Sequence, residues 1–327
     1  MSMGRHPDIP GRFHVAIGGN ATHPPGILGT PEDQGAIAHA TGCALLPLME
    51  LNNELVITHG NGPVVGKILM CQILARDRVT PMSMDICVAH SQGRIAYPLM
   101  QALENTLREA GNPHHVACLL TQVEVDPGDP AFQNPTKPIG YFYTEEEAQE
   151  LKKQMGWEMQ EDANRGWRHV VPSLEPKHIA DTSLVRTVIE GGAVCIAGGG
   201  GGIPVVRSAR GTREGVESVI DKDLTSALMA NVLRIEHMMI LTSVSSVAIY
   251  FGTDKERELD KISLSELRIY QPKDTSRREA WGPRSKLPSA FSRGVGNMSL
   301  LPNWKRRSPP YMAKRVRTLQ KNEGAPK

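Results

Sequence analysis

The sequence has no long hydrophobic run, because no apolar stretch in it approaches the roughly 18 residues that a membrane-spanning helix needs. The first thirteen residues, MSMGRHPDIPGRF, lack the apolar centre of a secretory signal peptide. The five cysteines are scattered without a CxxC pair, and several lie in apolar runs where a buried, reduced thiol is expected. These absences predict a cytoplasmic protein with no membrane partner.

Charge is distributed unevenly along the 327 residues. The whole chain has a formal net charge of +2, yet residues 271–327 contain 14 Lys and Arg against three Asp and Glu. The first 270 residues show the opposite balance, with 23 basic against 32 acidic residues. We therefore predict a boundary near Tyr270, between a folded domain over 1–270 and a basic, poorly ordered tail over 271–327.

Strand and helix signals alternate through the first 270 residues. Apolar runs that end in glycine or in a turn predict strands within 13–20, 54–66, 114–125, 193–202, 238–244 and 247–251. Apolar residues at helical spacing predict helices within 66–77, 182–192 and 222–235. This alternation predicts an α/β fold, a three-layer sandwich with a central, mainly parallel sheet covered by helices on both faces.

One segment, about 126–168, breaks the alternation. It contains prolines and polar turns, then a charged helix and a strand-like return. We interpret it as a small subdomain that protrudes from the sheet.

Glycine follows three of the predicted strands. Ligands collect at the carboxyl ends of strands in such sheets, and glycine lets backbone N–H groups approach a phosphate closely. Any one of these runs alone would be read as a tight turn, but three together favour a ligand. No GxxxxGK[ST] loop occurs, and no GxGxxG fingerprint with a following acidic residue, which disfavours a nicotinamide cofactor. The predicted phosphate-binding residues are Gly18, Gly19, Asn20, Gly60, Asn61, Gly62, Gly199, Gly200 and Gly201.

Two lysines are candidates for phosphoryl-transfer chemistry, which depends on neutralising oxygen charge. Lys222 lies between Asp221 and Asp223 at a predicted helix start, where aspartate is also an ordinary N-cap. Lys137 lies in NPTKPIG, where the flanking prolines stiffen the loop; on its own it would be read as a solvated lysine. We expect His59, in THGNGP, to be structural rather than a general base.

Seven motifs resemble the carbamate kinase branch of the amino acid kinase family, in the family's order. They are VAIGGNA, LVITHGNGP, SQGRIAY, DPAFQNPTKPIG, VVPSLEP, IAGGGGGIPVV and GVESVIDKDLTSALMA, within about residues 13–269. DPAFQNPTKPIG and GVESVIDKDL are peculiar to that branch. The resemblance implies the amino acid kinase fold, a homodimer, and the reaction ADP + carbamoyl phosphate ⇌ ATP + carbamate with Mg²⁺.

The resemblance also implies roles for individual residues. Lys137 corresponds to the lysine that the protruding subdomain brings over the active site. Lys222 and Asp223 correspond to the catalytic lysine and the aspartate that orders the lysines and the metal. The loops at Gly18–Asn20 and Gly60–Gly62 correspond to phosphate-binding loops, the second on the carbamoyl phosphate side. No residue is assigned as a metal ligand.

The tail departs from the family pattern, which continues with Gly-Ser-Met-Gly-Pro-Lys, a last helix and an Ala-Gly-Thr ending. In a shifted reading frame, each new codon takes the third base of one original codon and the first two bases of the next. Read in this frame, the codons of REAWGPR (278–284) can encode that string. Trp281 has a single codon, TGG, so the shifted codon that runs from Trp281 into Gly282 must encode glycine. We hypothesise a shift of reading frame at about residues 269–271.

Three alternatives remain open. A genuine basic tail could bind nucleic acid, with Trp304 and Tyr311 as stacking residues, although we do not expect a nucleic-acid partner. The chain could be an amino acid kinase that acts on a different acyl phosphate. It could also be a weak or inactive nucleotide-binding chain.

Overall fold

The structure is a computed structural model that describes residues 11–22, 29–50, 53–162, 165–235, 237–242, 247–249, 254–255, 257–259, 297–302 and 317–320. Its centre is a seven-stranded sheet. From one edge to the other the sheet consists of β18 (Arg317–Gln320), β17 (Asn297–Pro302), β14 (His237–Thr242), β1 (Arg12–Ile17), β2 (Glu54–His59), β10 (Val194–Ile196) and β3 (Val116–Cys118). Every neighbouring pair is parallel except β17 with β18.

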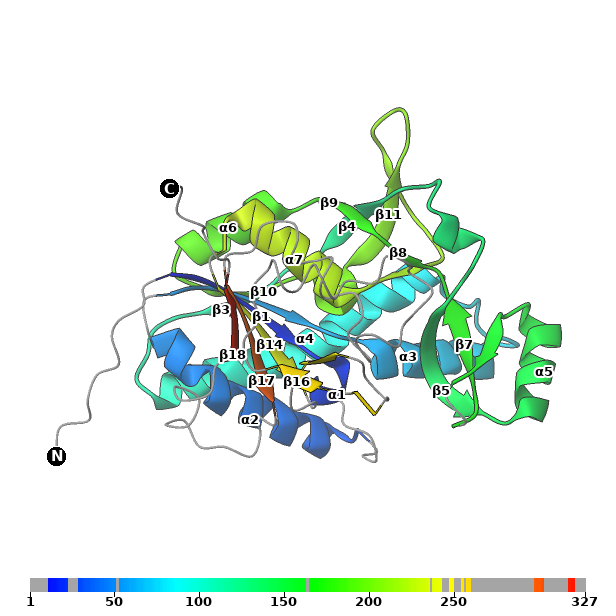
Figure 1. Ribbon diagram of the computed structural model, residues 1–327, viewed down its shortest axis with the longest axis horizontal. Helices are drawn as coiled ribbons and strands as arrows, with labels where there is room; N and C mark the ends of the chain where they lie inside the picture. Colours follow the sequence, from blue (N-terminus) through cyan, green and yellow to red (C-terminus); the bar gives the residue numbers. More distant parts are fainter. Residues whose placement is uncertain are drawn as a thin grey trace.

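Helices cover both faces of this sheet (Figure 1). One face is covered by α2 (Pro31–Glu50) and α4 (Met84–Glu109), the other by α6 (Thr182–Glu190) and α7 (Lys222–Leu233). Side-chain alternation along β1 serves both layers, because Phe13 and Val15 pack in the core of α2 and α4 whereas Ala16 packs in the core of α6 and α7. The predicted three-layer α/β sandwich with a mainly parallel sheet is confirmed.

The central sheet leads at one end into a second sheet. This sheet consists of β12 (Arg213–Gly215), β11 (Ile203–Arg207), β4 (Gln122–Val125) and β9 (Pro176–Ile179). The segment 114–125, predicted as one strand, is divided into β3 and β4. Gln92 on α4 accounts for the break, since its Oε1 accepts the N–H of Thr121 at 2.9 Å and removes that donor from a ladder. The prediction of a single strand is wrong here.

A small three-stranded unit lies at the right of Figure 1 and overlaps the segment 126–168 predicted to protrude. It consists of β5 (Lys137–Tyr143), α5 (Glu145–Met155), β6 (Met159–Glu161) and β7 (Trp167–Val171), with β7 between the other two strands. Helix α5 begins with a capping box of Thr144 and Glu147 and ends at Gly156, which has a left-handed φ of 66°. The charged stretch of the sequence therefore forms a well-capped helix on a three-stranded sheet.

Further elements connect these layers. They are α1 (Gly19–Thr22), α3 (Gly62–Ala75), the 3₁₀ turns η1 (Pro130–Phe132) and η2 (Gly199–Gly201), and the strands β8 (Ser173–Leu174), β13 (Val219–Ile220), β15 (Val247–Ile249) and β16 (Arg257–Leu259). Helix α3 packs against β5, and β8 pairs with β13. Among the described helices, none is long and apolar enough to cross a bilayer.

Two strands of the central sheet, β17 and β18, belong to the segment predicted as a poorly ordered tail. Residues 297–302 pair with β14 in parallel, and residues 317–320 pair with β17 in antiparallel orientation. An exposed strand edge offers unpaired N–H and C=O groups, so a short extended segment such as NMSLLP can add to it. These two strands lie within the predicted tail, whose boundary and order stay a prediction, and the rest of the tail lies outside the described residues.

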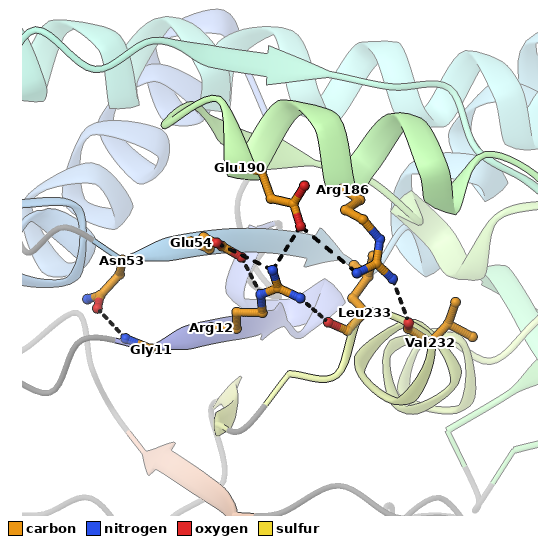
Figure 2. Close-up of polar contacts among 8 residues, drawn as sticks. All are labelled: Gly11, Arg12, Asn53, Glu54, Arg186, Glu190, Val232 and Leu233. Carbon is orange, nitrogen blue, oxygen red and sulfur yellow. Dashed lines mark hydrogen bonds and ion pairs between the residues drawn. The ribbon is translucent and has the colours of Figure 1, made fainter.

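Figure 2 shows a polar network at the amino end of β1. Arg12 donates to the carbonyl oxygen of Leu233 at 2.9 Å and to the carboxylate of Glu190 at 2.9 Å, and it also pairs with Glu54. Arg186 donates to the carbonyl oxygen of Val232 at 3.0 Å. Both carbonyls lie in the last turn of α7, so two arginines satisfy the end of this helix and oppose its negative pole.

Candidate active site

The first two glycine loops meet at the carboxyl ends of β1 and β2. The N–H of Gly60 donates to the carbonyl of Ile17 at 2.8 Å. A Cβ atom placed on Gly60 would lie 2.7 Å from the nitrogen of Gly19, which leaves no room for a side chain. The two loops therefore touch backbone to backbone, which explains the glycine at position 60, and phosphate binding by these loops stays a prediction.

The second loop begins helix α3. Asn61 is its N-cap residue, but the Asn61 side chain does not cap the helix; it donates from Nδ2 to the hydroxyl of Ser91 at 2.7 Å. The first N–H groups of an α-helix have no partner within the helix and carry positive partial charge. The N-terminus of α3, with Gly62 as its first residue, can thus receive an anion.

The third glycine run is packed inside the protein. Gly199, Gly200 and Gly201 are all buried, and a Cβ on Gly200 would lie 2.2 Å from Nδ2 of Asn61. Gln92 donates to the carbonyl of Gly199 at 3.0 Å, and Thr225 donates to that of Gly201 at 2.7 Å. These contacts explain the glycines by close packing beneath the second loop, and phosphate binding by them stays a prediction.

The N-terminus of α7 carries the predicted catalytic pair. Lys222 forms an ion pair with the adjacent Asp223, and both side chains are largely buried. A Cβ on Gly60 would lie 3.4 Å from Cδ of Lys222, so the lysine stem passes beside the second loop. Lys222, Asp223, Gly19 and Gly60 are therefore brought together. The side chain of Asn20 lies outside the described residues.

Lys137 reaches this region from the protruding subdomain and contacts Asp221, which the sequence predicts as an ordinary N-cap. Its ammonium lies 2.8 Å from Oδ2 of Asp221, while Oδ1 of Asp221 accepts the N–H of Asp223 at 3.0 Å. Burial opposes ionisation of Asp221, but the charges of Lys137 and Lys222 outweigh it and hold the pKa of this carboxyl below its usual range. The sequence shows Asp221 next to Lys222, but it does not show that Asp221 pairs with Lys137, because the two residues are 84 positions apart.

Two buried histidines lie next to the site as neutral groups. Burial lowers the pKa of His14 to about 3, with a further contribution from the charge of Lys222, and burial lowers the pKa of His59 to about 4. The hydroxyl of Thr58 donates to the carbonyl of Ala197 at 2.8 Å, so His14 must donate from Nε2 to Thr58 at 2.8 Å. A neutral, enclosed His59 supports a structural role for it rather than that of a general base.

A hollow of about 550 Å³ lies elsewhere, between α2 and α4. It is lined by residues such as His39, Arg94 and Tyr97 and by none of the predicted site residues. The chemistry-bearing groups converge at the loops instead, so we place the candidate active site there.

Carboxylates that could contact a metal are few at this site. Within the described part of the chain, no group of three or more His, Cys, Asp or Glu side chains could enclose a metal ion. Mg²⁺ usually keeps several waters and binds one or two carboxylates together with substrate phosphates. Asp223, at the helix start beside Lys222, fits such a partial ligand set.

Glycine loops, a helix N-terminus and lysines at the carboxyl edge of a parallel sheet define a phosphate-handling α/β enzyme. The chain belongs to the amino acid kinase family, which matches residues 17–293. It is 40% identical to the carbamate kinase of Pyrococcus horikoshii over 295 residues, 90% of this chain and 94% of the relative.

Solved structures show the same similarity. The carbamate kinase of Giardia lamblia bound to citric acid superposes with a TM-score of 0.86 at 31% identity, covering 96% of this chain and all of the other. The same enzyme bound to AMP-PNP gives a TM-score of 0.83 at 32% identity, with the same coverage. The family match extends past Tyr270, so the boundary predicted there stays a prediction.

Proposed function

We propose that this chain is a carbamate kinase, which transfers a phosphoryl group reversibly between carbamoyl phosphate and ADP to give ATP and carbamate. The observation that carries the proposal is the meeting of Lys222, the Lys137–Asp221 pair and two glycine loops at one edge of the sheet. The carbamate kinases of Pyrococcus and Giardia, to which the chain is similar over nearly its whole length, support this choice of substrate.

The two glycine loops divide the binding task. Asn61 and Gly62, at the N-terminus of α3, hold the phosphoryl group of carbamoyl phosphate through backbone N–H groups, and Gly60, whose own N–H donates to Ile17, lines the same loop. Gly18, Gly19 and Asn20 face the phosphates of the nucleotide. Direct contact between Gly19 and Gly60 supports neighbouring positions for the donor and acceptor phosphates, as in-line transfer requires.

Transfer itself forms one bond and breaks one. An oxygen of the ADP β-phosphate attacks the phosphorus, and the bond from phosphorus to the carbamate oxygen breaks, so carbamate leaves with the bonding electron pair. Negative charge spreads over the transferring oxygens, where Lys222 and Lys137 stabilise it. Asp223 orients Lys222 through their ion pair.

The nucleotide, the metal and the assembly complete the proposal. The Giardia enzyme has been solved with AMP-PNP, which supports ATP and ADP as ligands here. Bound Mg²⁺ would neutralise charge on the nucleotide phosphates, and Asp223 would supply a carboxylate to it. The motif resemblance supports a homodimer, and the scattered cysteines in apolar runs support a cytoplasmic location.

The test is formation of ATP from ADP and carbamoyl phosphate, followed with a coupled assay across a range of Mg²⁺ and pH. We expect Lys222→Ala to lower kcat by about 10²–10³, because it removes one donor to the transferring phosphoryl group. Lys153→Ala, an exposed lysine on α5, is the matched control and should keep the wild-type rate. Turnover of acetylglutamyl or aspartyl phosphate in place of carbamoyl phosphate, or none by folded protein, would contradict the proposal.

A further inference from the structure

The Lys137–Asp221 ion pair joins two separate parts of the fold. Lys137 is the first residue of β5 in the protruding subdomain, and Asp221 precedes α7 in the core. The ammonium and the carboxylate are 2.8 Å apart, with the side chains 39% and 15% exposed. A contact of this kind sets where the lysine of the subdomain lies relative to the core.

Backbone pairing builds this contact. Lys137 pairs with Val171 at the end of β7, and the chain then continues into β8. Strand β8 pairs in parallel with β13, and the N–H of Val219 donates to the carbonyl of Pro172 at 3.0 Å. Strand β13 ends immediately before Asp221. The register of four strands thus delivers both partners to one place, which distinguishes the pair from an accidental surface contact.

Asp221 has one oxygen more than a helix cap needs. Oδ1 accepts the N–H of Asp223 at 3.0 Å and caps α7, a task that asparagine performs equally well. Oδ2 has the separate partner Lys137. The negative charge is therefore dispensable for capping, and its direct ion-pair partner is Lys137.

We propose that Asp221 is a positioning residue, which holds the Lys137 ammonium at the mouth of the active site, beside Lys222 and the loop at Gly60, so that it meets the transferring phosphoryl group. A lysine stem has four rotatable bonds, and the ion pair with Asp221 narrows the positions that its charge can take. This inference rests on the proposed function for its kinetic consequence, but the contact itself can be tested without substrate.

Asp221→Asn keeps the cap and removes the charge. In ligand-free protein we expect acetylation of Lys137, measured by mass spectrometry against exposed Lys153, to become up to about fivefold faster, as loss of an ion pair allows. Asp181→Asn is the matched control, because Asp181 is the N-cap residue of the neighbouring helix α6 and lies outside the site. It should leave the labelling of Lys137 unchanged. Equal labelling of Lys137 in Asp221→Asn and wild type would overturn the inference.

A double-mutant cycle tests the kinetic role. We expect Asp221→Asn to lower kcat about tenfold in the wild-type background, by misplacing one charged group, and to have no further effect when Lys137 is already alanine. Equal slowing in both backgrounds, or no slowing in either, would show that Asp221 does not act through Lys137. If the wild type forms no ATP, the proposed function fails, and the labelling result alone decides the inference.

Discussion

Replacement of Gly66 by alanine tests how the protruding subdomain is seated. Gly66 lies in α3, and a Cβ atom added there would lie 2.1 Å from Cα and 2.7 Å from the nitrogen of Gly140 on β5. Ordinary carbon–carbon contacts are about 3.5–4.0 Å, so the two backbones must separate by about 1.5 Å. Backbone atoms cannot rotate away as a flexible side chain can, and β5 has to move as a whole.

Movement of β5 carries Lys137 with it, because Lys137 lies three residues before Gly140 on the same strand. A misplacement of about 1 Å can cost about 10²-fold in rate, and we expect Gly66→Ala to lower kcat by that order. The free energy of unfolding should fall by only about 0–2 kcal/mol, since overpacking costs about 1–3 kcal/mol and alanine favours the helix by about 1 kcal/mol. The coupled ATP assay and urea unfolding measure the two effects separately.

Gly93→Ala is the matched control for helix propensity. Gly93 lies within α4, and a Cβ there would have no neighbour within 4 Å. This variant should keep the wild-type rate and gain stability slightly. If Gly66→Ala showed both the wild-type rate and unchanged stability, the close seating of β5 on α3 would be refuted.

The remaining predictions concern stability. Arg12→Ala should lower the free energy of unfolding by about 1–2 kcal/mol in urea titration with kcat unchanged, because it removes charge-assisted bonds at the end of α7 far from the loops. His14 and His59 are neutral in the folded protein, whereas in the unfolded chain their pKa is near the ordinary value of about 6.5. The free energy of unfolding should therefore be highest above about pH 6.5 and fall below it by about 1.4 kcal/mol per pH unit for each histidine. The fall ends when the pH reaches the folded pKa, about 3 for His14 and about 4 for His59. A free energy of unfolding that stays flat between about pH 7 and pH 5 would contradict this. The 327-residue chain should melt at a lower temperature and turn over more slowly than a variant in which the residues after 269 are replaced by those of the shifted reading frame. Equal melting temperatures and rates would refute the frame-shift hypothesis.

Local patterns predicted the parts of the fold in which the chain's own periodicity determines the element. β1, β2, β10 and β14 are short apolar runs that end at turns, and α6 and α7 have apolar residues at helical spacing, each with an aspartate at its N-cap position. The two longest helices, α2 and α4, were not predicted. Each contains a proline, Pro47 and Pro98, which interrupts the pattern although packing against the sheet maintains the helix.

Contacts between distant segments account for the other differences. Gln92 on α4 intercepts Thr121 and divides the predicted strand 114–125, an effect that the residues of the strand do not reveal. The run at Gly199–Gly201 has the composition of a phosphate loop, yet Asn61 and Gln92 fill the space around it. Glycine composition indicates that backbone must approach something closely, and only the fold tells whether that is a ligand or another part of the chain.

The two lysines of the candidate site reach it by different routes, and this difference has a consequence for its chemistry. Lys222 extends from the start of α7, a helix capped by Asp221 at one end and by Arg12 and Arg186 at the other. Its position therefore depends on the core alone. Lys137 depends on the seating of a separate subdomain, through the Gly66 contact and through Asp221. Because both charges are needed when negative charge spreads over the transferring oxygens, perturbations of the subdomain should lower kcat strongly with at most a small loss of stability.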